Sequence, residues 1–468
     1  MTKKITHLAL ALVTLLTGCS MIPTYERPAA PVPTGFPNVA ASESPATLPS
    51  WRTYFAEPRL QQLIELALNN NRDLRIASLN VEQARAQFQV RRAAQYPAVG
   101  LAANASRAPA SGTGNITNNF SVGLAVTAWE LDFFGRVASL KEQALAQYLA
   151  TEEGRNAAQV SLISSVANGW LNLLADEELL ELSRRTLATR EESVRLTKLR
   201  LDSGAASELD YRQAESLAQA ARATLAQQQR QRALDENALA LLLGQPLPQD
   251  IRATLGRSDL NAAPAMQTVP AGLPSDLLVQ RPDIRQAEQQ LIAANANIGA
   301  ARAAFFPRIS LTAQAGTSSG ELSGLFKNGS WGFTLAPSLL LPLFDAGANQ
   351  ANLESAQASR SVAVAQYEKA IQTAFREVAD ALASQSSLTE QLEAQRKQAE
   401  AESIRFKLAD LRYQNGVASY LDLLDAQRSL FSTQQGVVQV RLSQLQNQVS
   451  LFKALGGGWT DETTSAKP

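Results

Sequence analysis

The chain has 468 residues, of which 43 are basic and 43 acidic, so its formal net charge at pH 7 is zero. A balanced charge argues against a nucleic-acid partner, because proteins that bind nucleic acids present a basic surface to the phosphates. The single cysteine and single histidine exclude a disulfide framework and a metal site built from these two residue types. We expect no metal site and no cofactor.

Residues 1–18 have the pattern of a secretion signal. Two lysines precede an apolar run, Leu8 to Leu16, that is too short to cross a bilayer as a helix. The run ends in Leu-Thr-Gly-Cys, which is similar to a bacterial lipobox, and the only cysteine of the chain, Cys19, falls at its end. We therefore predict acylation of Cys19, the alternative being an ordinary signal peptide with an unrelated cysteine. The residue after it is Ser20 rather than aspartate, which by the sorting rule for Gram-negative lipoproteins points to the outer membrane.

The segment after the cysteine is rich in proline over residues 20–50, which predicts an extended strap rather than a packed element. A helical pattern follows from Leu60 to Ala94 and is interrupted near three consecutive asparagines at 69–71. Pro97 ends this helix, since proline lacks the amide hydrogen that a helix requires.

Two β-hairpins are predicted from period-two alternation. Apolar residues alternate with small or polar ones at 99–106 and 120–127, and again at 309–316 and 331–336. This period is typical of strands. Loops rich in glycine, serine, threonine and asparagine at 107–118 and 317–329 join the members of each pair.

Two very long helices are predicted at 136–201 and 346–412, which contain no proline. Each would extend roughly 100 Å at about 1.5 Å per residue. The second has a heptad pattern that predicts a coiled-coil seam, with one set at Val364, Ile371, Val378, Gln385, Leu392 and Ala399 and another at Tyr367, Ala374, Ala381, Leu388 and Gln395. Gly204 and Gly416 end these helices, and new helices start at Ser207 and Ser419 and run to about residues 243 and 455.

The chain is an internal tandem duplication. A pattern that begins at Leu199 reappears at Leu411, with a constant offset of 212 positions. In both places it reads, in order, Leu-Arg, Gly, Ala-Ser, Leu-Asp and Ala. We divide the chain into a signal peptide (1–18), a lipidated extended segment (19–57), a first repeat (58–270) and a second repeat (271–468). Each repeat has the order helix, β-hairpin, long helix, tight turn, helix, and so the fold class is α+β.

The strand lengths suit a transmembrane barrel, but one chain supplies too few strands. Strands of about ten residues match a tilted membrane-spanning strand, and aromatic residues gather near the strand ends as in interfacial girdles. Four strands cannot close a barrel, and an open edge is not tolerated in lipid. If these strands lie in outer-membrane lipid, more than one chain is therefore needed, and three chains would supply twelve strands. A soluble hairpin with core aromatics is the alternative.

These features resemble the outer-membrane factor family of tripartite efflux systems, the TolC/OprM type, and in particular the lipoprotein branch that serves RND-class pumps. The resemblance covers essentially the whole mature chain. It rests on the segments Trp129–Arg136, Gln280–Ile284, Ala301–Pro307, Leu341–Asp345, Tyr420–Arg428 and Lys453–Trp459. It implies a homotrimeric 12-stranded outer-membrane β-barrel continued by a periplasmic α-helical barrel of long coiled-coil helices, with a periplasmic adaptor protein and an inner-membrane RND pump as partners.

No catalytic residues are expected, because His7 lies in the signal peptide and nothing else forms an enzymatic constellation. The resemblance places a periplasmic gate at the start of the last helix, with Leu421 and Asp425 as ring residues. Asp425 lies one turn beyond the helix cap, and the first repeat has Gln213 at that position. Arg428 has the i+3 spacing that allows pairing with Asp425.

Asp422 has two readings. It stands three residues after Ser419, the spacing of a capping box, and it is also a candidate member of the gate. The turn residues Gly204, Ser207, Gly416 and Ser419 are the candidate docking points for the adaptor.

The function expected from these observations is an export duct for small molecules in an RND-type multidrug efflux system, located in the outer membrane of a Gram-negative bacterium and extending into the periplasm. One alternative is the duct of a type I protein-secretion system, which shares the fold. Another is a periplasmic coiled-coil lipoprotein without a pore, which would have no paired strands.

Overall fold

The structure is a computed structural model that describes residues 20–36, 49–109, 114–257, 260, 266 and 281–457. The predicted signal peptide, Cys19 and the predicted boundary between residues 270 and 271 lie outside the described residues. The chain forms two compact units. Unit 1 comprises residues 1–30, 78–154 and 283–370, and unit 2 comprises 31–77, 155–282 and 371–468. Each unit therefore contains segments of both sequence repeats.

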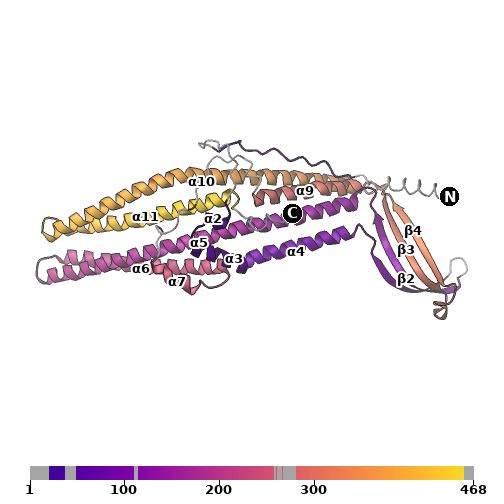
Figure 1. The fold of residues 1–468 in the computed structure, drawn as a ribbon, viewed down its shortest axis with the longest axis horizontal. Coiled ribbons are helices and arrows are strands. Elements are labelled where there is room, and N and C mark those ends of the chain that lie inside the picture. The colour runs from indigo at the N-terminus through magenta and orange to yellow at the C-terminus, as the bar shows by residue number, and fades with distance from the viewer. Residues whose placement is uncertain are drawn as a thin grey trace. The chain divides into compact units, whose positions relative to one another are not determined.

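Unit 1 holds the β-sheet. Its strands are β1 (Val99–Pro109), β2 (Ile116–Leu131), β3 (Arg308–Ser319) and β4 (Trp331–Leu340), with a short 3₁₀ helix, η2 (Leu322–Gly324), in the second connection. The unit also includes most of α4 (Arg72–Ala93), nearly all of α9 (Pro282–Ala303), and the first parts of α5 (Arg136–Asp202) and α10 (Ala348–Gln414). Figure 1 shows β2, β3 and β4 side by side.

Unit 2 is helical. It contains α2 (Trp51–Tyr54), α3 (Pro58–Asn70), α6 (Glu208–Leu243), α7 (Gln249–Thr254), η1 (Leu255–Arg257), α11 (Tyr420–Ala454) and the remaining parts of α5 and α10. The predicted long helices are confirmed, and each has 67 residues. Within the described part of the chain, no helix combines the length and the apolar character needed to cross a membrane.

The sheet is antiparallel throughout, with strand order β1-β2-β3-β4. One row of directly opposite residues joins Leu101, Leu124, Ala315 and Phe333, and the adjacent row joins Gly100, Ala125, Gln314 and Thr334. Residues of one row share a face, so the sheet has an apolar face and a face of small and polar residues. The apolar side chains are exposed in the protomer: Leu101 is 77% and Phe333 73% accessible. The predicted period-two strands are confirmed.

The strands extend further into the predicted loops than the alternation indicated. Arg107 pairs with Asn118, and Pro109 pairs with Ile116, although these positions were expected in the first loop. β3 likewise continues to Ser319. Polar residues are tolerated at these strand ends because both faces are accessible there, and hydropathy alone does not mark the limit of backbone pairing.

A β-bulge keeps the apolar face continuous along β2. Val126 pairs with Ala313, but the next pair is Trp129 with Leu311, so β2 has one more residue than β3 in this interval. Ala128 takes the left-handed conformation, with φ of 48°. Without the extra residue, Trp129 would point to the polar face.

Two glycines allow β2 and β3 to approach closely. Gly123 and Gly316 pair directly. A Cβ atom at Gly123 would lie 2.4 Å from the Ala315 carbonyl oxygen, and one at Gly316 would lie 2.2 Å from the Val122 carbonyl oxygen. Any side chain at either position therefore requires the strands to move apart.

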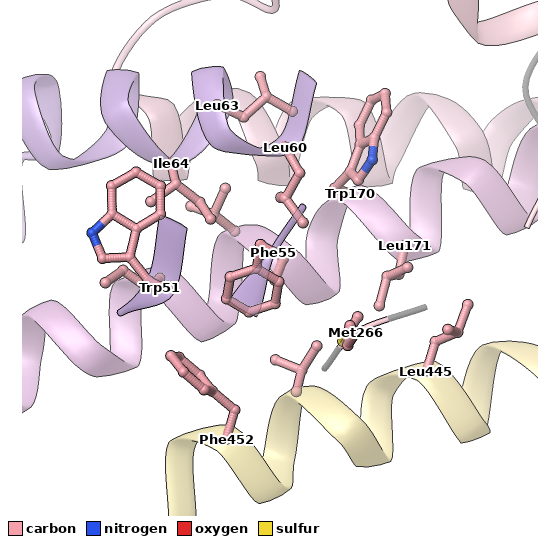
Figure 2. Close-up of a cluster of buried hydrophobic side chains, with 14 of the residues drawn as sticks. Trp51, Phe55, Leu60, Leu63, Ile64, Trp170, Leu171, Met266, Leu445 and Phe452 are labelled. Atoms are coloured by element: carbon pink, nitrogen blue, oxygen red, sulfur yellow. The ribbon is translucent and has the colours of Figure 1, made fainter. Parts of the chain in front are cut away.

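The core of unit 2 gathers aromatic residues from short and long helices (Figure 2). Tyr54 stacks on Phe452 with ring centroids 4.3 Å apart, and its hydroxyl donates to the Gln448 carbonyl at 2.9 Å. The Trp170 indole donates to the Glu57 carboxylate at 2.9 Å. These contacts join α2 and the residue preceding α3 to α5 and α11.

The heptad seam predicted in α10 is confirmed in part: six of its eleven positions, Tyr367, Ile371, Ala374, Val378, Ala381 and Leu392, are buried. The other five, Val364, Gln385, Leu388, Gln395 and Ala399, are only partly buried in the protomer. Over residues 20–36 the predicted strap forms no helix or strand, but its Phe36 is buried and stacks on Phe375 with ring centroids 4.9 Å apart, so this end is packed. The guanidinium of Arg27 in the strap donates to both oxygens of Glu288, at 2.7 and 2.9 Å, within unit 1.

Candidate gate at the helical turns

The two interhelical turns of unit 2 have the same geometry. Two residues after the end of α5 and of α10, a glycine takes the left-handed conformation, Gly204 with φ of 74° and Gly416 with φ of 73°. The Ala205 amide donates to the Arg200 carbonyl at 2.7 Å, and the Val417 amide donates to the Arg412 carbonyl at 2.9 Å. This is the pattern of a helix end closed at a left-handed glycine, and so the predicted tight turns are confirmed.

A capping box starts each of the following helices. In α11 the Asp422 amide donates to the Ser419 hydroxyl at 3.2 Å, and the Ser419 amide donates to the Asp422 carboxylate at 3.1 Å. Ser207 and Asp210 make the equivalent pair in α6. The hydrogen bonds from the Ser419 hydroxyl and amide hold the pKa of Asp422 below its usual value. The structure thus gives Asp422 a local role in starting the helix.

Asp425 lies between two arginines. Its carboxylate makes a salt bridge with Arg405 of α10, and the guanidinium of Arg428 lies 3.9 Å away on α11. Arg405 also pairs with Glu402 at 3.1 Å, and these hydrogen bonds, first to Asp425 and then to Glu402, raise the pKa of Arg405. The spacing argument found Arg428, but the direct partner is Arg405.

Sequence reasoning missed Arg405, although a signal existed. Arg405 and Asp425 lie at nearly equal distances from the turn at Gly416, and antiparallel helices joined by a short turn bring such residues face to face. The corresponding positions of the first repeat, 212 residues earlier, are Ser193 and Gln213. The salt bridge at these two positions therefore has no equivalent in the hairpin of α5 and α6.

Leu421 points away from the helix packing. Its neighbours Leu423 and Leu424 are buried with Tyr420 against Ala214 of α6, whereas Leu421 is 58% accessible. Asp425 and Arg428 have side chains 52% and 53% accessible. The structure thus presents Leu421, Asp425 and Arg428 on an exposed surface of α11, while the buried leucines fix the start of the helix.

The outer strands of the sheet are each paired on one side only among the described residues. β1 pairs with β2, and β4 pairs with β3. Each outer strand therefore has a row of backbone groups available for another strand.

Comparison with known proteins identifies the relatives of this chain. The sequence profile described as outer membrane efflux protein matches residues 63–245 and 273–457. The toluene efflux pump outer membrane protein TtgC of Pseudomonas putida is 46% identical over 483 residues, covering 100% of this chain and 98% of that protein. Outer membrane protein OprJ of Pseudomonas aeruginosa is 44% identical, covering 97% of this chain and 96% of that protein.

Solved structures agree with these sequence relatives. The open state of the Neisseria gonorrhoeae outer membrane channel MtrE superposes with a TM-score of 0.85 at 41% identity, covering 94% of this chain and 99% of that one. CusC superposes with a TM-score of 0.83 at 40% identity, covering 94% of this chain and all of the other.

Proposed function

The chain belongs to the outer membrane efflux protein family, and we propose that three copies form an export duct whose periplasmic end is gated at the turn before α11. It is the outer-membrane duct of an RND-type multidrug efflux system. The observation that carries the proposed assembly is the four-stranded sheet, which has one apolar face and, among the described residues, outer strands paired on one side only. Three such sheets joined edge to edge supply twelve strands and leave no edge open to lipid.

The comparisons favour efflux over protein secretion. Relatives of this chain are named as outer membrane proteins of toluene, solvent and antibiotic efflux pumps. We therefore expect apolar or amphipathic small molecules as cargo. The four paired strands contradict the alternative of a coiled-coil lipoprotein without a pore.

The gate is proposed at Leu421 and Asp425 of the three chains. A threefold arrangement would place three carboxylates near one axis, where they repel one another. Arg405 and Arg428, which contact Asp425 within each chain, offset that repulsion. The closed duct is then held by these pairs together with the packing of Leu421, and opening requires this end of α10 and α11 to move outward.

The partners proposed are an adaptor protein in the periplasm and an RND pump in the inner membrane. The turn residues Gly204, Ser207, Gly416 and Ser419 are all exposed. Their repeated geometry would offer six similar docking points in a trimer. We propose the adaptor contact there.

One experiment tests the duct directly. The purified protein is examined by native mass spectrometry in detergent and by single-channel recording in a planar bilayer. We expect a trimer and discrete conductance steps. A detergent-solubilised monomer as the main species would contradict the edge-closure argument, and a trimer without conductance would contradict the duct.

A further inference from the structure

A cavity of 210 Å³ lies within unit 2 between α5, α10 and α11. Its walls are partly apolar, from Leu182, Phe406, Leu430 and Phe431, and partly polar. The cavity adjoins the proposed gate in sequence, because Phe406 follows Arg405 and Gln427, another lining residue, precedes Arg428. Arg185 and Thr189, which also line the cavity, are exposed, so it opens to solvent on the side of α5.

The feature that distinguishes this cavity is Arg190, a lining residue that is only 7% accessible. Its Nη1 donates to the Leu217 carbonyl at 3.1 Å, while its Nε is buried and has no hydrogen-bond partner among the described residues. No salt bridge found in the described part of the chain includes Arg190. Buried arginines are ordinarily paired with a carboxylate, so the charge lacks the partner that burial usually demands.

The surroundings of Arg190 favour an anion. Burial lowers the pKa of its guanidinium, and the positive charge of Arg428 lowers it further. An anion placed in the cavity would relieve both effects. The Arg190 guanidinium also lies over the ring of Phe431, 5.7 Å from its centroid, so the charged group and an aromatic surface are presented together.

We propose that this cavity binds a small organic anion, a carboxylate on a single aromatic ring, with the carboxylate at Arg190 and the ring between the apolar walls. The Thr186 hydroxyl, which also lines the cavity, provides a further hydrogen-bond donor. The volume is below the range of about 300–1,000 Å³ typical of drug-sized ligands, which favours one ring over a larger molecule.

A consequence for the channel rests on the proposed gate. Arg428 interacts with both the gate and the cavity. Its guanidinium lies 3.9 Å from the Asp425 carboxylate, and its positive charge lowers the pKa of Arg190. An anion beside Arg190 attracts Arg428 away from Asp425 and weakens one of the contacts that hold the gate closed. Binding of the anion is therefore expected to increase the open probability.

The test uses the purified detergent-solubilised protein and isothermal titration calorimetry with benzoate, and with benzamide as the neutral counterpart. We expect saturable benzoate binding with one site per chain and no comparable binding of benzamide. Arg190→Gln should weaken benzoate binding about tenfold or more, because a hydrogen-bonded charge pair is lost. Arg184→Gln is the matched control on the same helix, since Arg184 does not line the cavity, and it should bind benzoate as the wild type does.

Arg190→Lys is measured as well, because removal of a buried side chain can impair folding. Lysine keeps the charge but not the planar fork of donors, so we expect weaker binding in a normally assembled protein. Equal binding of benzoate and benzamide, or wild-type affinity in Arg190→Lys, would overturn the proposed site. Calorimetry does not depend on conduction, and so a failed anion site is distinguishable from a failed duct, which the conductance of the unliganded protein reports.

Discussion

Arg405 of α10 and Asp425 of α11 form a salt bridge across the hairpin of the second repeat, at positions where the first repeat has Ser193 and Gln213. The two hairpins share their turn geometry and their capping boxes, but only the second has an ion pair at these two positions; the first has one elsewhere, between Arg222 and Glu191. The two repeats thus share the turn but place their interhelical ion pairs at different positions.

The first prediction concerns that connection. Arg405→Gln should raise the open probability of the channel about twofold to fivefold, the range expected for loss of an exposed ion pair. The measurement is single-channel recording, together with the vancomycin sensitivity of an expressing strain. The effect should shrink at high salt, since exposed charges are screened.

Arg222→Gln is the control for this experiment. Arg222 of α6 pairs with Glu191 of α5 at 2.6 Å, which is an interhelical contact of similar exposure in the first repeat. This variant should match the wild type in open probability. If both variants open the channel equally, general loosening of the helices, rather than the Asp425 contact, controls the gate.

The second prediction concerns ion selectivity. Three Asp425 carboxylates around a narrow pore favour cations, so Asp425→Ala should lower the preference for cations and move the reversal potential in a salt gradient toward zero. Asp422→Ala should change selectivity less, because Ser419 holds that carboxylate at the helix start and Asp422 is not one of the proposed ring residues. Equal selectivity in the wild type and Asp425→Ala would place the constriction elsewhere.

The third prediction concerns the amino terminus. Cys19 should be the acylated first residue of the mature protein, because it ends the apolar run in a lipobox pattern. Mass spectrometry of the amino-terminal peptide should show an acylated cysteine. Cys19→Ser with a cleavable signal should still insert if the strands themselves hold the protein in the membrane. A mature start at another residue would contradict the prediction.

Local patterns predicted much of this structure. The alternation at 99–106 predicted β1, the glycine at 416 predicted the end of α10, and the serine at 419 predicted the capping box, because each depends on residues close in sequence. The full extent of the strands was not predicted, since pairing of Arg107 with Asn118 depends on the partner strand.

Features that depend on contacts distant in sequence were not predicted. The bulge between Val126 and Trp129 is visible only when β2 is aligned with β3. The partner of Asp425 requires the register of two antiparallel helices. Nothing in the polar sequence around Arg190 indicates that this arginine is buried. Charged residues on a long helix are usually solvated, and only the packing of α6 and α11 against α5 shows the exception.

The last prediction concerns a pair of carboxylates within unit 2. Asp176 of α5 is 6% accessible, and its pKa is raised to about 7 by burial first, then by a hydrogen bond with Asp235 of α6 and the negative charges of Asp235 and Glu177. The folded protein therefore retains a proton that the unfolded chain, with an ordinary aspartate pKa of 3.8, releases at lower pH. Stability should fall as the pH rises from about 4 to about 7, because over this range the folded state binds more protons than the unfolded state.

Asp176→Asn should remove this fall in stability at higher pH, since asparagine has nearly the same shape as aspartate, can still hydrogen-bond and carries no charge. Melting temperatures of the detergent-solubilised protein, followed by circular dichroism at pH 5 and pH 8, provide the measurement. The melting temperature of the variant should exceed that of the wild type by more at pH 8 than at pH 5. Each unit by which the folded-state pKa is raised corresponds to about 1.4 kcal/mol of unfolding free energy. Asp202→Asn is the control, because Asp202 is exposed and paired with Lys198 at 2.7 Å, and it should not reproduce this pH-dependent gain. An Asp176→Asn protein whose advantage is the same at both pH values would show that the buried pair does not share a proton.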